Sequence, residues 1–198
     1  LRCENMSCPA QLKERISHFA SREAMDIEGM GDAISAQLVD KKMVKDYGDI
    51  YSLKHEDVAN LERMADKSAT NLISAIEKSK SNSLARLVYG LGIRHVGVRS
   101  AWILASRFKS IDRLMKADIE ELQGINEIGP VMAESVYSFL RTDENRKVIE
   151  KLKNSGVNTK EKDAGPKAGN MEGKNFVVTG YLEGFSRHQI EEFIRKSG

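Results

Sequence analysis

One short pattern, repeated four times, constrains this chain more than any other feature of its sequence. Each copy reads apolar, two variable residues, apolar, then Gly or Ala; a small residue follows four positions later and an apolar residue three positions after that. The copies begin at Ile27, Leu61, Ile93 and Ile125, so their spacings are 34, 32 and 32 residues. A nearly fixed period of this length is typical of a tandem array of helical units.

Each copy predicts a short turn followed directly by an α-helix. A glycine at the fifth position would supply a turn conformation that a Cβ disfavours. One helical turn later, the small residue lets a neighbouring helix approach closely, and the apolar residue continues the buried stripe. The small positions are Ser35, Ala69, Ala101 and Ala133, and the apolar positions are Leu38, Leu72, Leu104 and Val136. The predicted helices lie near 32–43, 66–80, 98–108 and 130–141, with a last helix over 143–154.

The same turns predict sites for anions. The first N–H groups of each helix have no acceptor within the helix, and together with the helix dipole they favour a group such as phosphate. The alternative is a plain helical repeat whose glycines serve only packing. In the second copy Arg63 and Ala65 stand where the first copy has Gly29 and Gly31, so we expect that turn to be structural.

The distribution of charge favours the third copy as an anion site. The 198-residue chain has a net charge of only +2, with 30% charged, 40% hydrophobic and 6% aromatic residues, which is typical of a soluble helical protein. No apolar run approaches the ~20 residues that a membrane span needs. Between residues 85 and 116, seven basic residues stand against one acid, Asp112. A basic surface there would attract a polyanion, whereas a solvated helix face would give the same pattern.

The two ends of the chain differ from the repeats. Residues 1–21 contain Cys3 and Cys8, which are half of a four-cysteine zinc site, two free thiols or a disulfide. Residues 154–170 are polar, aperiodic and rich in Gly and Lys, as in a flexible linker. In 171–198 a β-type run precedes a helical pattern; these two elements alone cannot bury a core, so we expect a truncated domain or a disordered tail. Since the chain starts at Leu1 rather than Met, we also expect a piece of a longer protein.

Taken in order, these segments resemble the C-terminal half of bacterial NAD-dependent DNA ligases. The stretch Cys-x4-Cys-Pro-Ala-Gln resembles the second half of that family's four-cysteine zinc finger. Residues 25–31 and 61–69 resemble its first two helix-hairpin-helix motifs, and residues 87–97 (LVYGLGIRHVG), the most specific stretch, are similar to its third. Residues 173–180 with Arg187 resemble the start of its BRCT domain.

The resemblance implies a mainly α fold. Four tandem helix-hairpin-helix motifs, arranged as two pairs, would occupy residues 22–153, between half a zinc finger (1–21) and, after the linker, an incomplete BRCT domain (171–198). The parent enzyme would seal nicks between a 3′-hydroxyl and a 5′-phosphate with NAD as adenylyl donor and Mg. Its adenylylated lysine lies in a Lys-x-Asp-Gly motif, which this chain lacks. We therefore expect a fragment that does not ligate but binds nicked duplex DNA as a monomer, in the bacterial cytoplasm and at the nucleoid.

In this interpretation, main-chain N–H groups and basic side chains hold the DNA backbone without reading its sequence. The third and first hairpins are expected to contribute most, then the fourth, then the second. The predicted DNA-contacting residues are Gly29, Gly31, Lys67, Ser68, Arg86, Arg94, His95, Gly97, Arg99 and Gly129. Cys3 and Cys8 are the predicted half of a zinc site, and no residue is expected to be catalytic. Two alternatives are a nuclease or excision-repair subunit built on the same hairpins, and a non-enzymatic scaffold that recruits proteins.

Overall fold

The computed structural model describes residues 9–161 and, near the C-terminus, residues 176, 177, 179, 190 and 194. The chain divides into two compact units, Leu1–Glu161 and Lys162–Gly198. Cys3, Cys8 and most of the segment that resembles a BRCT start lie outside the described residues, so neither expectation is tested by the fold.

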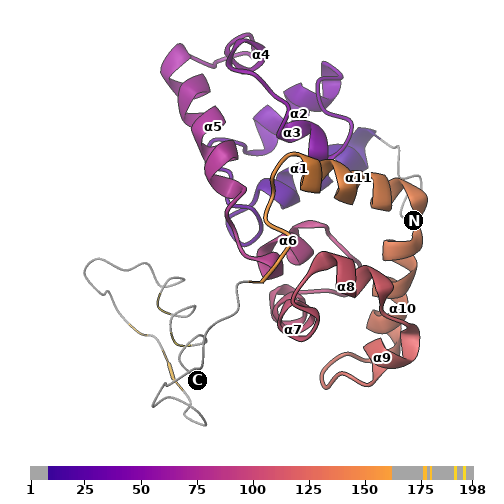
Figure 1. Ribbon diagram of the computed structural model, residues 1–198. Coiled ribbons are helices and arrows are strands. Elements are labelled where there is room, and N and C mark those ends of the chain that lie inside the picture. Colours follow the sequence, from indigo (N-terminus) through magenta and orange to yellow (C-terminus); the bar gives the residue numbers. More distant parts are fainter. Residues whose placement is uncertain (1–8, 162–175, 178, 180–189, 191–193, 195–198) are drawn as a thin grey trace. The chain divides into compact units, whose positions relative to one another are not determined.

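The first unit consists of α-helices joined by short turns (Figure 1). In the described part of the chain there is no strand, and the β-type pairing present is an isolated bridge between Ser110 and Lys160. The mainly α fold predicted from the sequence is therefore confirmed. In chain order the helices are α1 (Pro9–Ala20), α2 (Asp32–Asp40), α3 (Tyr47–Ile50), α4 (His55–Ala59), α5 (Asp66–Ser79), α6 (Leu84–Gly90), α7 (Val98–Phe108), α8 (Ile111–Lys116), α9 (Ile119–Gln123), α10 (Pro130–Arg141) and α11 (Asp143–Asn154).

Four pairs of helices flank the four repeated turns. The two members of each pair contact one another: α1 with α2, α4 with α5, α6 with α7, and α9 with α10. Helices α5, α7, α10 and α11 match the predicted ranges to within one residue. Helix α2 ends at Asp40, earlier than expected, because Lys42 takes a left-handed conformation with φ of 58° that stops the helix.

The repeated small and apolar positions form the core between these helices. The side chains of Ser35, Ala69, Ala101 and Ala133 are all 0% exposed. The apolar residues one turn further along their helices, Leu38, Leu72, Leu104 and Val136, are buried as well. This confirms the predicted packing face: a small side chain at the start of each helix admits a close neighbour, and dispersion contacts follow from the close approach.

An aromatic cluster fixes α3 against α1 in the same core. The ring of Phe19 stacks on Tyr47 with centroids 4.8 Å apart and planes 6° from parallel, and Tyr51 meets Phe19 edge-on at 6.3 Å. Buried aromatic pairs in such offset or T-shaped geometry add to the energy of area burial.

The structure differs from the sequence prediction at residues 154–161, which were expected to begin a flexible linker. Val157 is buried, and main-chain bonds join Asn158 N–H to the Lys80 carbonyl and Glu161 N–H to the Lys109 carbonyl, each at 2.8 Å. This stretch therefore belongs to the first unit, which ends at Glu161. The polar sequence of this stretch predicted a linker because main-chain hydrogen bonds, rather than apolar side chains, hold most of it in place, and such bonds leave no pattern in the sequence.

Candidate nucleic-acid interface

The four repeated turns share one backbone conformation. We call them turn 1 (27–31), turn 2 (61–65), turn 3 (93–97) and turn 4 (125–129). In each, the N–H of the fourth residue donates to the carbonyl of the first, at 3.1 Å in turns 1, 3 and 4 and 3.3 Å in turn 2. The third residue has a positive φ in every copy: Gly29 at 88°, Arg63 at 60°, His95 at 67° and Glu127 at 71°. The repeat seen in the sequence is therefore also a repeat of main-chain geometry.

The fifth residue of each turn is extended rather than left-handed, which corrects the role expected for its glycines. Gly31, Gly97 and Gly129 have φ of −82°, −91° and −75°, values open to any residue. A Cβ added to any of the three would meet nothing within 4 Å. Neither backbone conformation nor packing in the described chain requires glycine there, so the packing-only alternative fails. What a side chain at these exposed positions would obstruct is an approach from outside the protein.

These fifth residues are also the N-caps of α2, α5, α7 and α10. None of the four caps makes a side-chain hydrogen bond to the first turn of its helix. Among the other helices, side chains of Asp46, Ser83, Ser110 and Asp118 cap α3, α6, α8 and α9, whereas α4 and α11 also lack a side-chain cap. The helices that follow the repeated turns thus present uncapped N–H groups at their positive ends.

Turn 3 shows this arrangement most completely. In α7 the N–H of Ala101 donates to the Gly97 carbonyl at 2.9 Å, so the N–H groups of residues 98–100 come before the first complete helical bond. Arg94, His95 and Arg99 lie on the same turn and helix start, all exposed, and residues 93–99 contain no acid. A group of amides and cations of this kind suits an oxyanion.

The other three turns carry acids as well as possible donors. Turn 1 and the start of α2 expose Glu28 and Asp32, and the Asp32 carboxylate accepts a short hydrogen bond from the Ser17 hydroxyl. Turn 2 and the start of α5 expose Glu62 and Asp66 beside Arg63 and Lys67. Electrostatically, turn 1 is therefore a weaker anion site than turn 3, although the two were ranked together from sequence.

Arg99 is not an isolated cation. Its guanidinium forms a two-pronged ion pair with Glu127 of turn 4, with Nε and Nη2 lying 2.8 and 2.7 Å from the two carboxylate oxygens. The hydrogen bonds from Arg99 lower the pKa of the Glu127 carboxyl, and the same pairing raises the pKa of Arg99. Glu127 was missed in the sequence; the available signal was an acid at the turn position where the other copies have Gly, Arg and His.

Arg86 does not fit its predicted role. Only 14% of its side chain is exposed; its Nε donates to the Ala24 carbonyl at 2.7 Å, and Nη2 donates to the Arg22 carbonyl. The guanidinium also lies 3.9 Å from Asp26. Through these contacts Arg86 stabilises the segment that leads into turn 1, and we leave it out of the proposed interface.

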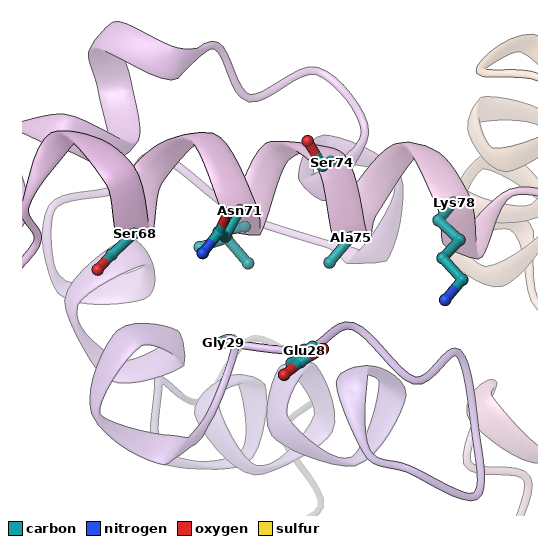
Figure 2. A pocket seen from close by; sticks show the side chains of 8 residues that line it. Glu28, Gly29, Ser68, Asn71, Ser74, Ala75 and Lys78 are labelled. Atoms are coloured by element: carbon teal, nitrogen blue, oxygen red, sulfur yellow. The ribbon is translucent and has the colours of Figure 1, made fainter.

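Helix α2, which follows turn 1, contacts turn 2, and a groove lies between turn 1 and α5. The Gln37 side chain bonds both main-chain groups of Glu62 in turn 2, accepting from N–H at 2.7 Å and donating to the carbonyl at 3.3 Å. Figure 2 shows the groove between Gly29 of turn 1 and the polar side of α5. Its volume is about 530 Å³. Ser68, predicted as a DNA contact, lines it; Lys67 is exposed next to it at the start of α5. Gln37 thus joins α2, which follows turn 1, to turn 2, and Arg99 joins the start of α7, which follows turn 3, to turn 4.

Comparison with known proteins identifies the relatives of this chain. The family model for the helix-hairpin-helix motif matches residues 86–149, which contain turns 3 and 4. Over its whole length the chain is 53% identical to a DNA ligase of Pelotomaculum thermopropionicum, 47% to one of Thermoanaerobacter sp. and 48% to one of Clostridioides difficile. From end to end, this chain matches part of a bacterial DNA ligase. It spans 29 to 30% of the length of these ligases.

The match supports the resemblance noted in the sequence, and the ion pair of Arg99 and Glu127 lies within the residues that match the helix-hairpin-helix motif. Among the described residues, no three His, Cys, Asp or Glu side chains are grouped to hold a metal ion. None of the described helices has the length and apolar character to cross a membrane.

Proposed function

We propose that this chain is the DNA-binding portion of an NAD-dependent DNA ligase and that it clamps duplex DNA around a nick through the sugar-phosphate backbone. The parent enzyme would join a 3′-hydroxyl to a 5′-phosphate. NAD and Mg would be bound by the part of that enzyme outside this chain. Cys3 and Cys8 would be half of its zinc site, and residues 171–198 the start of its BRCT domain.

The observation that carries the proposal is the repeated geometry of exposed, uncapped helix starts. Four turns with one backbone conformation end in Gly, or Ala in turn 2, and three of these positions have open space where a Cβ would stand. A phosphate can approach main-chain N–H groups closely only where no side chain intervenes. Contacts of this type position a duplex without reading bases, so the binding should be independent of sequence.

Within this interface we assign turn 3 the main role. Gly97 would admit a phosphate to the amides at the start of α7, while Arg94, His95 and Arg99 would supply charge. Gly29, Gly31, Lys67 and Ser68 would contact the backbone from turns 1 and 2, and Gly129 from turn 4. The DNA ligase relatives favour this proposal over a nuclease subunit.

The test is binding of the chain to nicked and intact duplexes of several sequences across a salt series. We expect binding that is independent of sequence and falls steeply with salt, since each neutralised phosphate contributes about 0.9 to the slope of log K against log salt. A flat salt response, or strong preference for one sequence, would contradict the proposal. A scaffold that only recruits proteins would show no affinity for either duplex.

Gly97→Val tests the glycine itself. Because the φ of Gly97 is −91° and its Cβ direction is empty, we expect the helical circular dichroism to be kept and the stability to change by no more than about 1 kcal/mol. DNA affinity should fall about tenfold, as for loss of one hydrogen bond to a charged group. Gly124→Val, at the end of α9, is the control at a glycine outside the turns. Loss of the fold in Gly97→Val would make Gly97 a packing residue.

A further inference from the structure

We propose that, in the DNA-free protein, the Glu127 carboxylate bonds the guanidinium donors of Arg99 that a DNA phosphate would use. DNA must therefore displace this carboxylate before Arg99 can bind the backbone. The inference rests on the proposed DNA-binding function. It assigns turn 4 a role that sequence analysis did not give it: an internal competitor for the cation of turn 3.

The first argument is the geometry of the pair. Two parallel N–H···O bonds of 2.7 and 2.8 Å join the Arg99 guanidinium to both carboxylate oxygens. A backbone phosphate presents two oxygens to arginine in the same fork-like arrangement. Glu127 therefore satisfies the same donors that a phosphate would use.

The second argument is that both residues are locally unfavourable choices. Arg99 is the second residue of α7, where a cation meets the positive end of the helix dipole. Glu127 has a φ of 71°, in the left-handed region that non-glycine residues seldom adopt. Arg99 gains nothing from its place in the helix, and the left-handed backbone disfavours Glu127 as it does Arg63 and His95 at the same position of turns 2 and 3. Such conflicts occur at sites kept for function rather than stability.

The third argument is exposure. The side chain of Arg99 is 69% exposed and that of Glu127 is 45% exposed, so water reaches the pair and its net contribution to folding is small. An exposed pair of this kind can exchange one partner for another at little cost. Once a phosphate holds Arg99, the displaced Glu127 adds a like charge beside the DNA and opposes binding. Glu127 should therefore lower affinity for DNA without being needed for the fold.

The experiment is a double-mutant cycle on the whole 198-residue chain, with binding to a nicked duplex measured across a salt series. Glu127→Gln keeps the size of the side chain and removes its charge. We expect it to bind about threefold more tightly. The slope of log K against log salt should stay unchanged, because Arg99 contacts the same phosphate in both proteins. Arg99→Gln should bind more weakly than wild type, with a shallower slope.

The decisive result is the combination of the two changes. In the Arg99→Gln background, Glu127→Gln should act no more strongly than removal of another exposed acid, because only the general loss of one negative charge remains when its partner is absent. Glu120→Gln removes one exposed acid of α9 and is the matched control for a general change in charge. If Glu127→Gln acts no more strongly than Glu120→Gln, or acts equally with and without Arg99, the competitor role is overturned. If wild type itself does not bind DNA, the proposed function fails instead; thermal unfolding of each variant identifies any that has lost its fold.

Discussion

Ser35 departs from the other three copies of the repeat by a single atom. It occupies the small-residue position that is alanine in α5, α7 and α10, and its side chain is 0% exposed. Within the described structure its hydroxyl has no hydrogen-bond partner. A buried hydroxyl without a partner lowers stability. Ser35→Ala should therefore raise the free energy of unfolding by about 1 kcal/mol, measured by urea denaturation with an unchanged slope.

The reverse substitution is the control for this prediction. Ala101→Ser adds a hydroxyl at the equivalent, equally buried position of α7 and should lower stability by a similar amount. If Ser35→Ala is destabilising, the hydroxyl has a partner and the four small positions are not equivalent. The sequence predicted burial at all four sites correctly, whereas the unsatisfied hydroxyl required the surroundings of Ser35.

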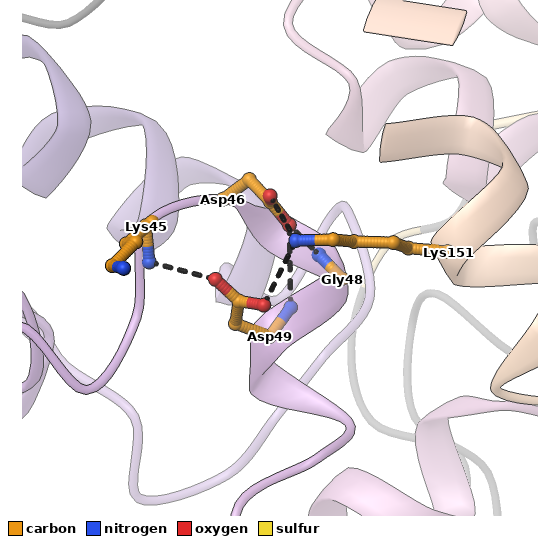
Figure 3. Close-up of polar contacts among 5 residues, drawn as sticks. All are labelled: Lys45, Asp46, Gly48, Asp49 and Lys151. Atoms are coloured by element: carbon orange, nitrogen blue, oxygen red, sulfur yellow. Dashed lines mark hydrogen bonds and ion pairs between the residues drawn. The ribbon is translucent and has the colours of Figure 1, made fainter. Parts of the chain in front are cut away.

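At the scale of elements, the contact between α3 and α11 depends on the absence of one side chain. Lys151 of α11 reaches both Asp46 and Asp49, at 2.6 and 3.0 Å, as Figure 3 shows. A Cβ on Gly48, in α3, would lie 2.6 Å from the Lys151 Cβ. Real Cβ atoms do not approach this closely, so a methyl group at residue 48 must push the helices apart.

Gly48→Ala should therefore destabilise the protein by about 2 kcal/mol, as overpacking does elsewhere. The measurement is urea or thermal unfolding. Gly31→Ala is the control, since the same methyl group there meets nothing within 4 Å and should change stability by no more than about 1 kcal/mol. Equal losses in the two variants would show that α3 and α11 are not in tight contact.

The turns illustrate how much of an element could be predicted locally. The starts of α2, α5, α7 and α10 follow the pattern residue by residue, because a β-turn and a helix start depend on neighbours in the chain. The position of left-handed backbone was wrong by two residues, since it falls on Gly29 and its equivalents rather than on Gly31. The presence of a glycine in the sequence does not show whether the position needs a positive φ, as at Gly29, or only lacks a side chain above the helix start, as at Gly31.

At the scale of the whole molecule, two buried tyrosines predict a loss of stability at alkaline pH. Burial raises the pKa of Tyr47 to about 12, opposed in part by the positive charge of Arg15. Burial likewise raises the pKa of Tyr51 to about 12, against the hydrogen bond with Ser79. In the unfolded chain tyrosine ionises near pH 10. Their contribution is therefore complete below pH 10 and is lost as the pH rises from about 10 to about 12.

Over that interval the free energy of unfolding should fall by roughly 1 kcal/mol per pH unit for each tyrosine. Lys151 and Lys153 act in the same direction, because hydrogen bonds to carboxylates raise their pKa values. Urea unfolding at pH 8, 10 and 11 measures the fall, and tyrosinate absorbance reports the ionisation. Tyr47→Phe should reduce the steepness of the decline; an unchanged decline would show that Tyr47 does not contribute to it.

The sequence by itself determined the repeat, its period, the starts of the helices that follow the turns and the buried small positions. These features follow from residues a few places apart, whose main-chain geometry and helical period are local. Only the tertiary structure decided which charged and polar groups already have a partner within the protein and which are available to bind DNA. It pairs Arg99 with Glu127, binds Arg86 to the Ala24 carbonyl and ties residues 158–161 to Lys80 and Lys109. The physical reason is that a charged or polar group takes whichever partner folding brings within about 3 Å, and distance along the chain does not reveal that partner.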